Sequence, residues 1–290
     1  VMITNRIAGP MTQASSIFTK YYHAKAALRT LDGIMQQDDE RKASTKYIQR
    51  KHFDGSVSFD KVNFTYPGEK KSALTDLSFE INPGDHLAIL GPVGSGKSSI
   101  LKLLLKLYDA DSGEIRIDDL DINQIDPFEL RKNISYVNQS PILFYGTLRE
   151  NIICSKTLAT DEEILSVAKM SGLSGFVKSH PLGFDMNVGE GGERLSNGQR
   201  QSVAIARALL SDSRFVLLDE PTSAIDNAIE KVLKESLSSF TQGKTLILVT
   251  HRKSLLDLVE KILVVSNGNL VNFGSKEQIL KAVQEGGTDA

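Results

Sequence analysis

The residues best suited to chemistry form a glycine-rich stretch with the spacing G-x-x-x-x-G-K-[ST], the pattern of a phosphate-binding loop. The stretch consists of Gly91, Pro92, Val93, Gly94, Ser95, Gly96, Lys97 and Ser98, followed by Ser99. Glycines let successive backbone N–H groups converge on an anion, and the N-terminus of a following helix adds its positive dipole end. We expect these residues to bind a nucleoside triphosphate, with Lys97 on the β- and γ-phosphates and the Ser98 hydroxyl on Mg²⁺.

Apolar segments on both sides of this loop fit the expected context. Residues 86–90 form a short apolar run suited to a buried strand, and residues 99–105 suit a helix. A Gly/Ser-rich loop that arose by chance is the alternative explanation for the loop alone. The succession of strand, loop and helix favours the nucleotide site.

A second apolar run, residues 215–218, ends in two carboxylates, Asp219 and Glu220. A buried parallel strand explains the apolar part. It does not explain two acids at the carboxyl end, where ligands bind in open α/β sheets. Asp219 is placed to hold Mg²⁺ as a Walker-B acid does, and Glu220 is the better candidate to orient or deprotonate the attacking water. Two acids that merely cap a helix are the alternative.

Between these motifs, residues 195–201 read LSNGQRQ. This segment resembles the LSGGQ signature of the ATP-binding cassette (ABC) ATPases, and the other motifs of that family are present in order. Tyr66 resembles the aromatic residue that stacks on adenine, and Gln139 the glutamine that touches Mg²⁺ and senses the partner domain. Asp226 resembles the D-loop aspartate and His251 the switch histidine. The resemblance implies an ABC nucleotide-binding domain with ATP and Mg²⁺ as its ligands.

The signature departs from the family's usual form at Asn197, where glycine is commoner. The resemblance implies that Ser196 and Gly198 make the anion contacts, with Gln199 beside them, and all three are intact. Asparagine tolerates left-handed backbone geometry better than most residues do. We therefore expect Asn197 to be tolerated. The property that it would affect is how tightly the site closes around the nucleotide. An ordinary helix N-cap at Ser196 is the alternative.

A single loop and a single signature in one chain have a consequence in this family, where the signature of one domain completes the phosphate site of another. The resemblance implies a head-to-tail homodimer with two ATP molecules at the interface. Residues acting within one chain would be the loop, Tyr66, Gln139, Asp219, Glu220 and His251. Ser196 and Gly198 would act on the ATP of the partner.

The composition of the 290-residue chain, 40% hydrophobic, allows one large domain or two small ones. With 34 basic and 36 acidic residues the net charge is −2, which favours neither nucleic acid nor an anionic membrane as a partner. The single cysteine, Cys154, fits a reducing compartment, and we expect a buried apolar thiol. No apolar run reaches membrane-spanning length, no secretory signal is evident, and the start at Val1 suggests a piece of a longer chain.

Residues 10 to about 36 have the pattern of an amphipathic helix opened by Pro10. A heptad-like apolar stripe follows one face of it: Ile17, Tyr21, Ala24, Leu28, Leu31 and Met35. This stripe either docks onto the adjacent domain or packs within a membrane bundle, and the periodicity leaves both open. A polar linker is expected from there to about His52.

The rest of the chain predicts an α/β fold, with β-rich residues 55–90 and a mainly helical stretch that starts at Gln139. The resemblance makes it a P-loop NTPase of the ABC ATPase type, with a mixed central sheet, an antiparallel β subdomain and an α-helical subdomain, preceded by the N-terminal helix. Residues 1–50 would be the end of a membrane-domain helix with its linker. Residues 51–290 would be the nucleotide-binding domain, with the helical subdomain at about 140–212, where Asp161 is the expected helix cap.

Several segments resemble ABC exporters in particular. Residues 139–152 approach the form Q-x-x-x-L-F-x-G-T-x-x-x-N-I. Residues 188–192 resemble the exporter X-loop, in which Glu190 would contact a coupling helix unless it is a solvated turn acid. Residues 5–13 and 250–256 resemble type I secretion exporters of the RTX-protein class.

That resemblance implies a motor for exporting an unfolded, secreted protein, placed on the cytoplasmic face of the bacterial inner membrane. Its partners would be its own upstream transmembrane domain, a membrane-fusion protein and an outer-membrane channel, with no nucleic acid. One alternative is a lipid, drug or peptide half-exporter, which differs in the upstream domains. Another is a soluble ABC ATPase of chromosome maintenance or translation, but such proteins carry coiled-coil insertions or two ATPase units, which this sequence lacks. An importer subunit would lack residues 1–50.

Overall fold

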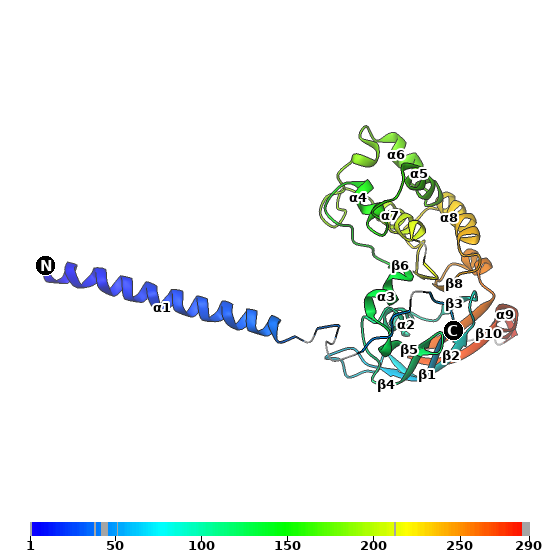
Figure 1. The fold of residues 1–290 in the computed structure, drawn as a ribbon, viewed down its shortest axis with the longest axis horizontal. Coiled ribbons are helices and arrows are strands. Elements are labelled where there is room, and N and C mark those ends of the chain that lie inside the picture. The colour runs from blue at the N-terminus through cyan, green and yellow to red at the C-terminus, as the bar shows by residue number, and fades with distance from the viewer. Residues whose placement is uncertain (1, 38, 42–45, 51, 212, 286–290) are drawn as a thin grey trace. The chain divides into compact units, whose positions relative to one another are not determined.

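The computed structural model describes the chain except for residues 1, 38, 42–45, 51, 212 and 286–290. It divides into two compact units, Val1–Lys46 and Tyr47–Ala290. The first unit contains one long helix, α1 (Met2–Met35) (Figure 1). The prediction that Pro10 opens this helix is wrong, because a proline within a helix removes one backbone hydrogen bond and need not end it. Side chains of residues 1–8 lie outside the described ones, so the segment 5–13 is described only in part.

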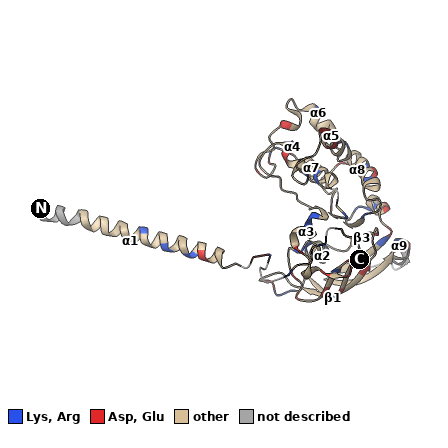
Figure 2. Ribbon diagram, in the orientation of Figure 1, with Lys and Arg blue, Asp and Glu red and all other residues tan. Residues whose placement is uncertain are grey.

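Apolar side chains are exposed along α1, among them Ile17, Tyr21, Leu28, Leu31 and Met35. Charged residues are sparse on this helix (Figure 2). Among the described residues, no helix combines the length and the apolar character needed to cross a membrane. Both roles predicted for the stripe stay predictions.

A six-stranded mixed sheet forms the centre of the second unit, in the order β10-β9-β3-β8-β7-β6. Its strands are β3 (His86–Leu90), β6 (Ile134–Val137), β7 (Phe215–Asp219), β8 (Thr245–Val249), β9 (Lys261–Ser266) and β10 (Asn269–Ser275). All neighbours pair in parallel except β9 and β10, which form an antiparallel edge. Every residue of β7 and β8 is buried, which explains why these segments are continuous apolar runs in the sequence.

A four-stranded antiparallel sheet, in the order β2-β1-β4-β5, forms a second layer. Its strands are β1 (Val57–Phe64), β2 (Leu74–Ile81), β4 (Ser112–Ile117) and β5 (Leu120–Asp121). The register of β1 against β2 slips between Phe59 and Val62, where Lys61 has a φ of 49°. Figure 1 shows both sheets at the same end of this unit. The predicted α/β class with a mixed sheet and an antiparallel β part is therefore confirmed.

The helices of the second unit are α2 (Lys97–Leu104), α3 (Pro127–Lys132), α4 (Leu148–Ile153), α5 (Asp161–Met170), α6 (Ser174–Ser179), α7 (Asn197–Leu210), α8 (Asn227–Phe240) and α9 (Lys276–Glu285). Helices α4 to α7 gather at the end of the unit opposite the β-sheets (Figure 1). The cap of α5 is Thr160 rather than the predicted Asp161, because the Thr160 hydroxyl accepts the Glu163 N–H while Glu163 accepts the Thr160 N–H.

Cys154 is exposed, so the prediction of a buried thiol is wrong. Helix α4 buries Leu148, Asn151 and Ile152, and Cys154 is its C-cap, where the chain turns away from that buried face. Its Sγ lies 3.3 Å from the Asn151 carbonyl oxygen. An apolar neighbourhood in sequence therefore did not indicate burial at the end of this short helix.

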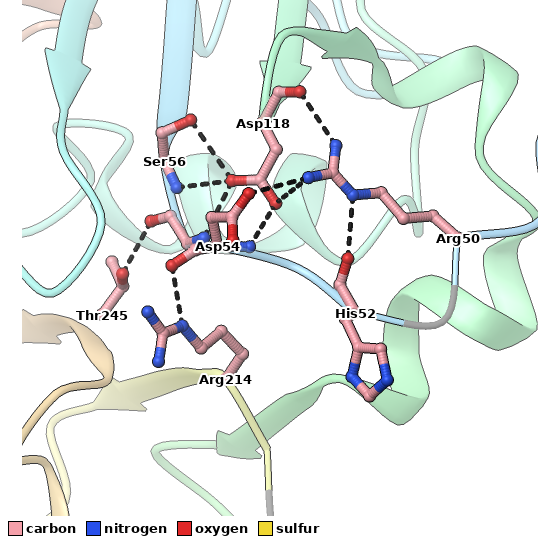
Figure 3. A network of polar contacts seen from close by, with 8 residues as sticks. Arg50, His52, Asp54, Ser56, Asp118, Arg214 and Thr245 are labelled. Atoms are coloured by element: carbon pink, nitrogen blue, oxygen red, sulfur yellow. Dashed lines mark hydrogen bonds and ion pairs between the residues drawn. The ribbon is translucent and has the colours of Figure 1, made fainter.

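A buried carboxylate fastens the beginning of the second unit to the sheets (Figure 3). Asp118, in the β4–β5 turn, accepts the backbone N–H groups of Asp54, Gly55 and Ser56 at 2.6, 2.8 and 2.8 Å. The Arg50 guanidinium lies 3.5 Å from the same carboxylate and donates to the Asp118 carbonyl oxygen. One side chain thus satisfies three successive backbone donors.

The same segment is tied to the central sheet. The Thr245 hydroxyl, at the start of β8, donates to the Gly55 carbonyl oxygen at 2.6 Å, and Arg214, just before β7, donates to that of Asp54 at 2.7 Å (Figure 3). A Cβ on Gly55, whose φ is 111°, would lie 2.5 Å from the Thr245 hydroxyl oxygen. Residues 54–56 are therefore fixed to the base of the two strands that carry functional residues at their other ends.

We expect Asp118→Asn to destabilise the chain by about 2 kcal/mol, because the carboxamide loses the charge that accepts three backbone donors. The matched control is Asp119→Asn, since Asp119 is exposed and both residues have positive φ. In thermal unfolding, Asp118→Asn should lower Tm by about 4–8 °C, and Asp119→Asn should leave it unchanged. Equal melting temperatures for the two variants would show that the network contributes nothing to stability.

Candidate nucleotide-binding and catalytic site

The phosphate-binding loop lies between β3 and α2, as the sequence predicts. Two of its glycines are required by their surroundings. A Cβ on Gly91, with φ 150°, would lie 2.0 Å from the Val265 carbonyl oxygen, and one on Gly96, with φ 103°, 2.5 Å from that of Ala73. Gly96 is also the N-cap of α2, so the first N–H groups of the helix face the loop. The loop therefore has the backbone of an anion site.

Lys97 is folded over this loop. Its Nζ donates to the carbonyl oxygens of Gly91 and Pro92 at 2.8 and 2.7 Å. Burial lowers the pKa of Lys97 below its ordinary value, and the nearby carboxylates Glu220 and Asp219 oppose that shift. The ammonium is thus held over the loop by its own carbonyl oxygens.

A cavity of about 420 Å³ adjoins the loop. It is lined by Tyr66, Glu69, Lys71, Ser72, Ala73, Val93, Gly94, Gly96, Lys97, Ser98, Ser99, Gln139 and Glu220. The sequence predicted most of these residues but missed Glu69, Lys71, Ser72 and Ala73, which connect β1 to β2. The adjacent cations Lys70 and Lys71, shortly after Tyr66, are a signal there for an anionic ligand.

Tyr66 closes one side of this cavity. Its hydroxyl lies 2.9 Å from the Ser99 Oγ, and Lys102 Nζ lies 5.1 Å from its ring centre. The ring also makes edge contacts with Phe64 and Tyr108. The predicted adenine-stacking residue is thus next to the loop, on a rigid aromatic cluster.

Asp219 is the buried last residue of β7. Burial raises the pKa of its carboxyl group, and the neighbouring Ser98 hydroxyl opposes the shift. Its Oδ1 is buried and has no hydrogen-bond partner among the described residues. A buried carboxylate oxygen without a donor, beside a serine hydroxyl, fits a divalent cation, and Mg²⁺ commonly takes only one or two protein carboxylates.

Glu220 contacts two other predicted site residues, Gln139 and His251. Its Oε2 accepts from the Gln139 Nε2 at 3.1 Å, and its Oε1 lies 3.5 Å from the His251 Nε2. Its φ of 47° is unusual for a residue other than glycine, and the backbone is held there by a hydrogen bond to the Val249 carbonyl oxygen. Such strain concentrates at functional sites. The carboxylate is therefore held between an amide and an imidazole beside the loop.

The signature residues lie at the start of α7, outside the loop cavity. Ser196 caps α7 and forms a reciprocal pair with Gln199, and a Cβ on Gly198 would lie 2.7 Å from the Ala224 carbonyl oxygen. Asn197 Oδ1 accepts a hydrogen bond from the Arg200 guanidinium.

Asp226 caps α8 by accepting the N–H groups of Ala228 and Ile229. Neither Ser196, Gly198, Gln199 nor Asp226 lines the loop cavity. Within one chain, contacts join the loop to Tyr66 and Asp219 and join Glu220 to Gln139 and His251, whereas these four residues lie outside the loop cavity.

A phosphate-binding loop on a parallel strand, with an acid pair at the end of a nearby strand, defines a P-loop nucleotide hydrolase. The family model described as "ABC transporter" matches residues 74–223, and the chain belongs to that family. It is an ABC ATPase domain, which binds and hydrolyses ATP.

Relatives and solved structures agree with this assignment. The ATP-dependent lipid A-core flippase 1 of Colwellia psychrerythraea is 38% identical in an alignment that covers 93% of this chain and 46% of the flippase. ATP-binding cassette sub-family B member 10, mitochondrial, from Mus musculus is 38% identical over 80% of this chain and 33% of its own length. A bacterial Atm1-family ABC exporter with ATP bound superposes with a TM-score of 0.83 at 33% identity, over 88% of this chain and 45% of the exporter. The chain thus spans less than half the length of these proteins.

Proposed function

We propose that the chain is the ATP-hydrolysing motor domain of an exporter and acts as a head-to-tail homodimer with two ATP molecules at the interface. This proposal is supported by the separation of the predicted site residues into two groups within one chain. Glu220 meets Gln139 and His251 beside the loop, whereas Ser196 and Gly198 lie outside the loop cavity. A second copy would supply the signature that each loop lacks.

In this proposal Tyr66 stacks on adenine, and the backbone of residues 91–99 with the Lys97 ammonium binds the phosphates. Ser98, Gln139 and Asp219 would hold Mg²⁺, which neutralises phosphate charge when bound. Glu220 accepts a proton from the attacking water, and the His251 imidazole donates to the γ-phosphate. From the partner, the Ser196 hydroxyl and the Gly198 N–H bind the γ-phosphate, with Gln199 and Asp226 completing that edge.

For the cargo, we propose a lipid-like amphiphile carried by a half-exporter. The lipid A-core flippase among the relatives supports this class of cargo. Its similarity covers 93% of this chain, which is far more than the ATPase motifs alone. Type I protein secretion, favoured by residues 5–13 and 250–256, is the second candidate. The comparisons lend no support to a membrane-fusion protein, an outer-membrane channel or a secreted protein as partners.

In this proposal the ATPase lies on the cytoplasmic face of a membrane. Residues 1–50 join it to its own transmembrane domain, and Glu190 contacts a coupling helix of that domain. The coding sequence upstream of Val1 tests it directly. Six apolar spans without a peptidase-like domain ahead of them would support a lipid half-exporter. A cysteine-peptidase-like domain would favour protein secretion, and an absence of spans would remove the transporter.

Lys97→Ala is expected to weaken ATP binding by at least about tenfold, because it removes a charge-assisted contact to the phosphates. The control is Lys70→Ala, since Lys70 is exposed and does not line the cavity. Titration with a fluorescent ATP analogue, read by anisotropy, gives both dissociation constants. Unchanged binding in Lys97→Ala would refute the assignment of the loop as the phosphate site.

A further inference from the structure

The segment that follows His251 lies along helix α8 and is held there by two ion pairs. The Arg252 guanidinium pairs with Glu230, and one helical turn further on Lys234 Nζ lies 2.5 Å from an oxygen of Asp257. The two pairs have opposite polarity, with the acid on α8 in the first pair and on the other segment in the second. The backbone carrying the switch histidine is therefore fastened to the helix that Asp226 opens.

The Glu230 pair is the buried one of the two. Glu230 is only 7% exposed, whereas the carboxylate of the other pair, Asp257, has a side chain that is 68% exposed. One Glu230 oxygen accepts from Arg252 Nη1 and the other from the Ser254 hydroxyl. Because both oxygens have donors, the buried charge is compensated, and removing the Arg252 guanidinium would leave an uncompensated carboxylate.

Arg252 also reaches the segment ahead of α8. Its Nη2 donates to the Ile225 carbonyl oxygen at 3.3 Å, and its backbone N–H donates to the Thr250 Oγ1 at 3.0 Å. One residue therefore joins three places: the loop around His251, the start of α8, and the backbone just before Asp226.

The His251 ring has few supports of its own. Its side chain is 47% exposed, and the Glu220 carboxylate at 3.5 Å is its one polar contact among the described residues. The position of the imidazole consequently depends on the backbone of residues 250–254, which Arg252 and Ser254 fix from the other side.

We infer that Arg252, through Glu230 and the Ile225 carbonyl, is a positioning residue for hydrolysis: it holds His251 opposite Glu220 and joins it to the Asp226 segment. This inference rests on the proposed function, in which His251 acts on the γ-phosphate and Asp226 lies at the dimer interface. Formation of the interface would then reposition the Asp226 segment and the histidine together.

Arg252→Gln tests the inference by steady-state ATPase measurements on the 290-residue chain. We expect kcat to fall by about tenfold, because a small misplacement of a catalytic group is enough for such a loss. KM for ATP should change by less than about twofold, because Arg252 does not line the loop cavity. Arg252→Lys, which keeps the charge toward Glu230, should recover part of kcat. The matched control is Lys234→Gln, which breaks the pair with the exposed carboxylate on the same helix and should leave kcat unchanged.

A second readout does not depend on turnover. The chain has five histidines, so the imidazole signal of His251 can be assigned in an NMR spectrum by comparison with His251→Ala. Arg252→Gln should shift that signal and Lys234→Gln should not. Ser254→Ala, which removes the other donor to Glu230, should shift it in the same direction and serves if Arg252→Gln does not fold.

The outcomes separate the inference from the proposed function. If wild type hydrolyses ATP, His251→Ala is inactive, and Arg252→Gln leaves both kcat and the His251 signal unchanged, only the inference is wrong. A parallel loss of kcat and rise of KM in Arg252→Gln, with no change in the His251 signal, would also overturn it and leave a merely structural ion pair. If wild type shows no ATP hydrolysis, or His251→Ala keeps full activity, the proposed function itself fails.

Discussion

Glu220→Gln is expected to abolish ATP turnover while leaving ATP binding intact. Glutamine has nearly the same shape, so it keeps the place between Gln139 and His251. Its amide cannot accept the proton of the attacking water, and the loss of a general base lowers kcat by about 10²- to 10⁴-fold. The phosphate-binding loop does not change, so the nucleotide should stay bound. We therefore expect the variant to accumulate as an ATP-bound dimer.

Two measurements check this result: release of inorganic phosphate, and molar mass by light scattering with and without Mg²⁺ and ATP. The expected outcome is no phosphate release and twice the mass of the single chain when ATP is present. Glu80→Gln, at an exposed position of β2, is the matched control and should behave as wild type. Wild-type-like hydrolysis in Glu220→Gln would remove Glu220 as the catalytic base.

His251→Ala is the second large effect. Its Nε2 is 3.5 Å from the Glu220 carboxylate, and the ring can also donate a hydrogen bond to a γ-phosphate. Removing a donor aimed at charge that develops in the transition state lowers kcat by about 10²- to 10³-fold. KM for ATP should change little, because His251 does not line the loop cavity.

His23→Ala is the matched control, since His23 is exposed on α1. Both variants are compared in the same phosphate-release assay over a range of ATP concentrations. A loss confined to KM, with kcat preserved, would instead make His251 a binding residue. Full activity in His251→Ala would exclude it from the chemistry.

Much of the site could be predicted from sequence because local physics fixes it. The loop needs glycine where a Cβ would meet Val265 or Ala73, so its spacing is recognisable without a structure. The buried strands β7 and β8 admit apolar residues on both faces, and the acids at the end of β7 stand out against that background.

The rest depends on contacts between residues distant in sequence. Asp118 is hydrogen-bonded to residues 54–56, which lie more than sixty positions away in the sequence, and no local sequence pattern predicts this contact. The lining residues between β1 and β2 are brought to the loop only by folding. The cap at Thr160 and the exposed Cys154 show the same limit at helix ends, where one position decides between burial and solvent.

The prediction of protein secretion illustrates a different limit. It depended partly on the segment 250–256, yet the residue types there have uses inside the domain. Arg252 and Ser254 bind Glu230, and Leu255 is fully buried. These contacts serve the ATPase whatever the cargo, so the segment carries little information about what is transported.

The central claim, hydrolysis at a site that two copies complete together, is tested most directly by specific ATPase activity as a function of chain concentration. Light scattering on the same samples gives the fraction of dimer in the presence of ATP. We predict that activity per chain rises with concentration in parallel with the dimer fraction. A constant activity per chain in samples that light scattering shows to be monomeric would contradict the claim, because a single chain keeps Ser196 and Gly198 out of its own loop cavity.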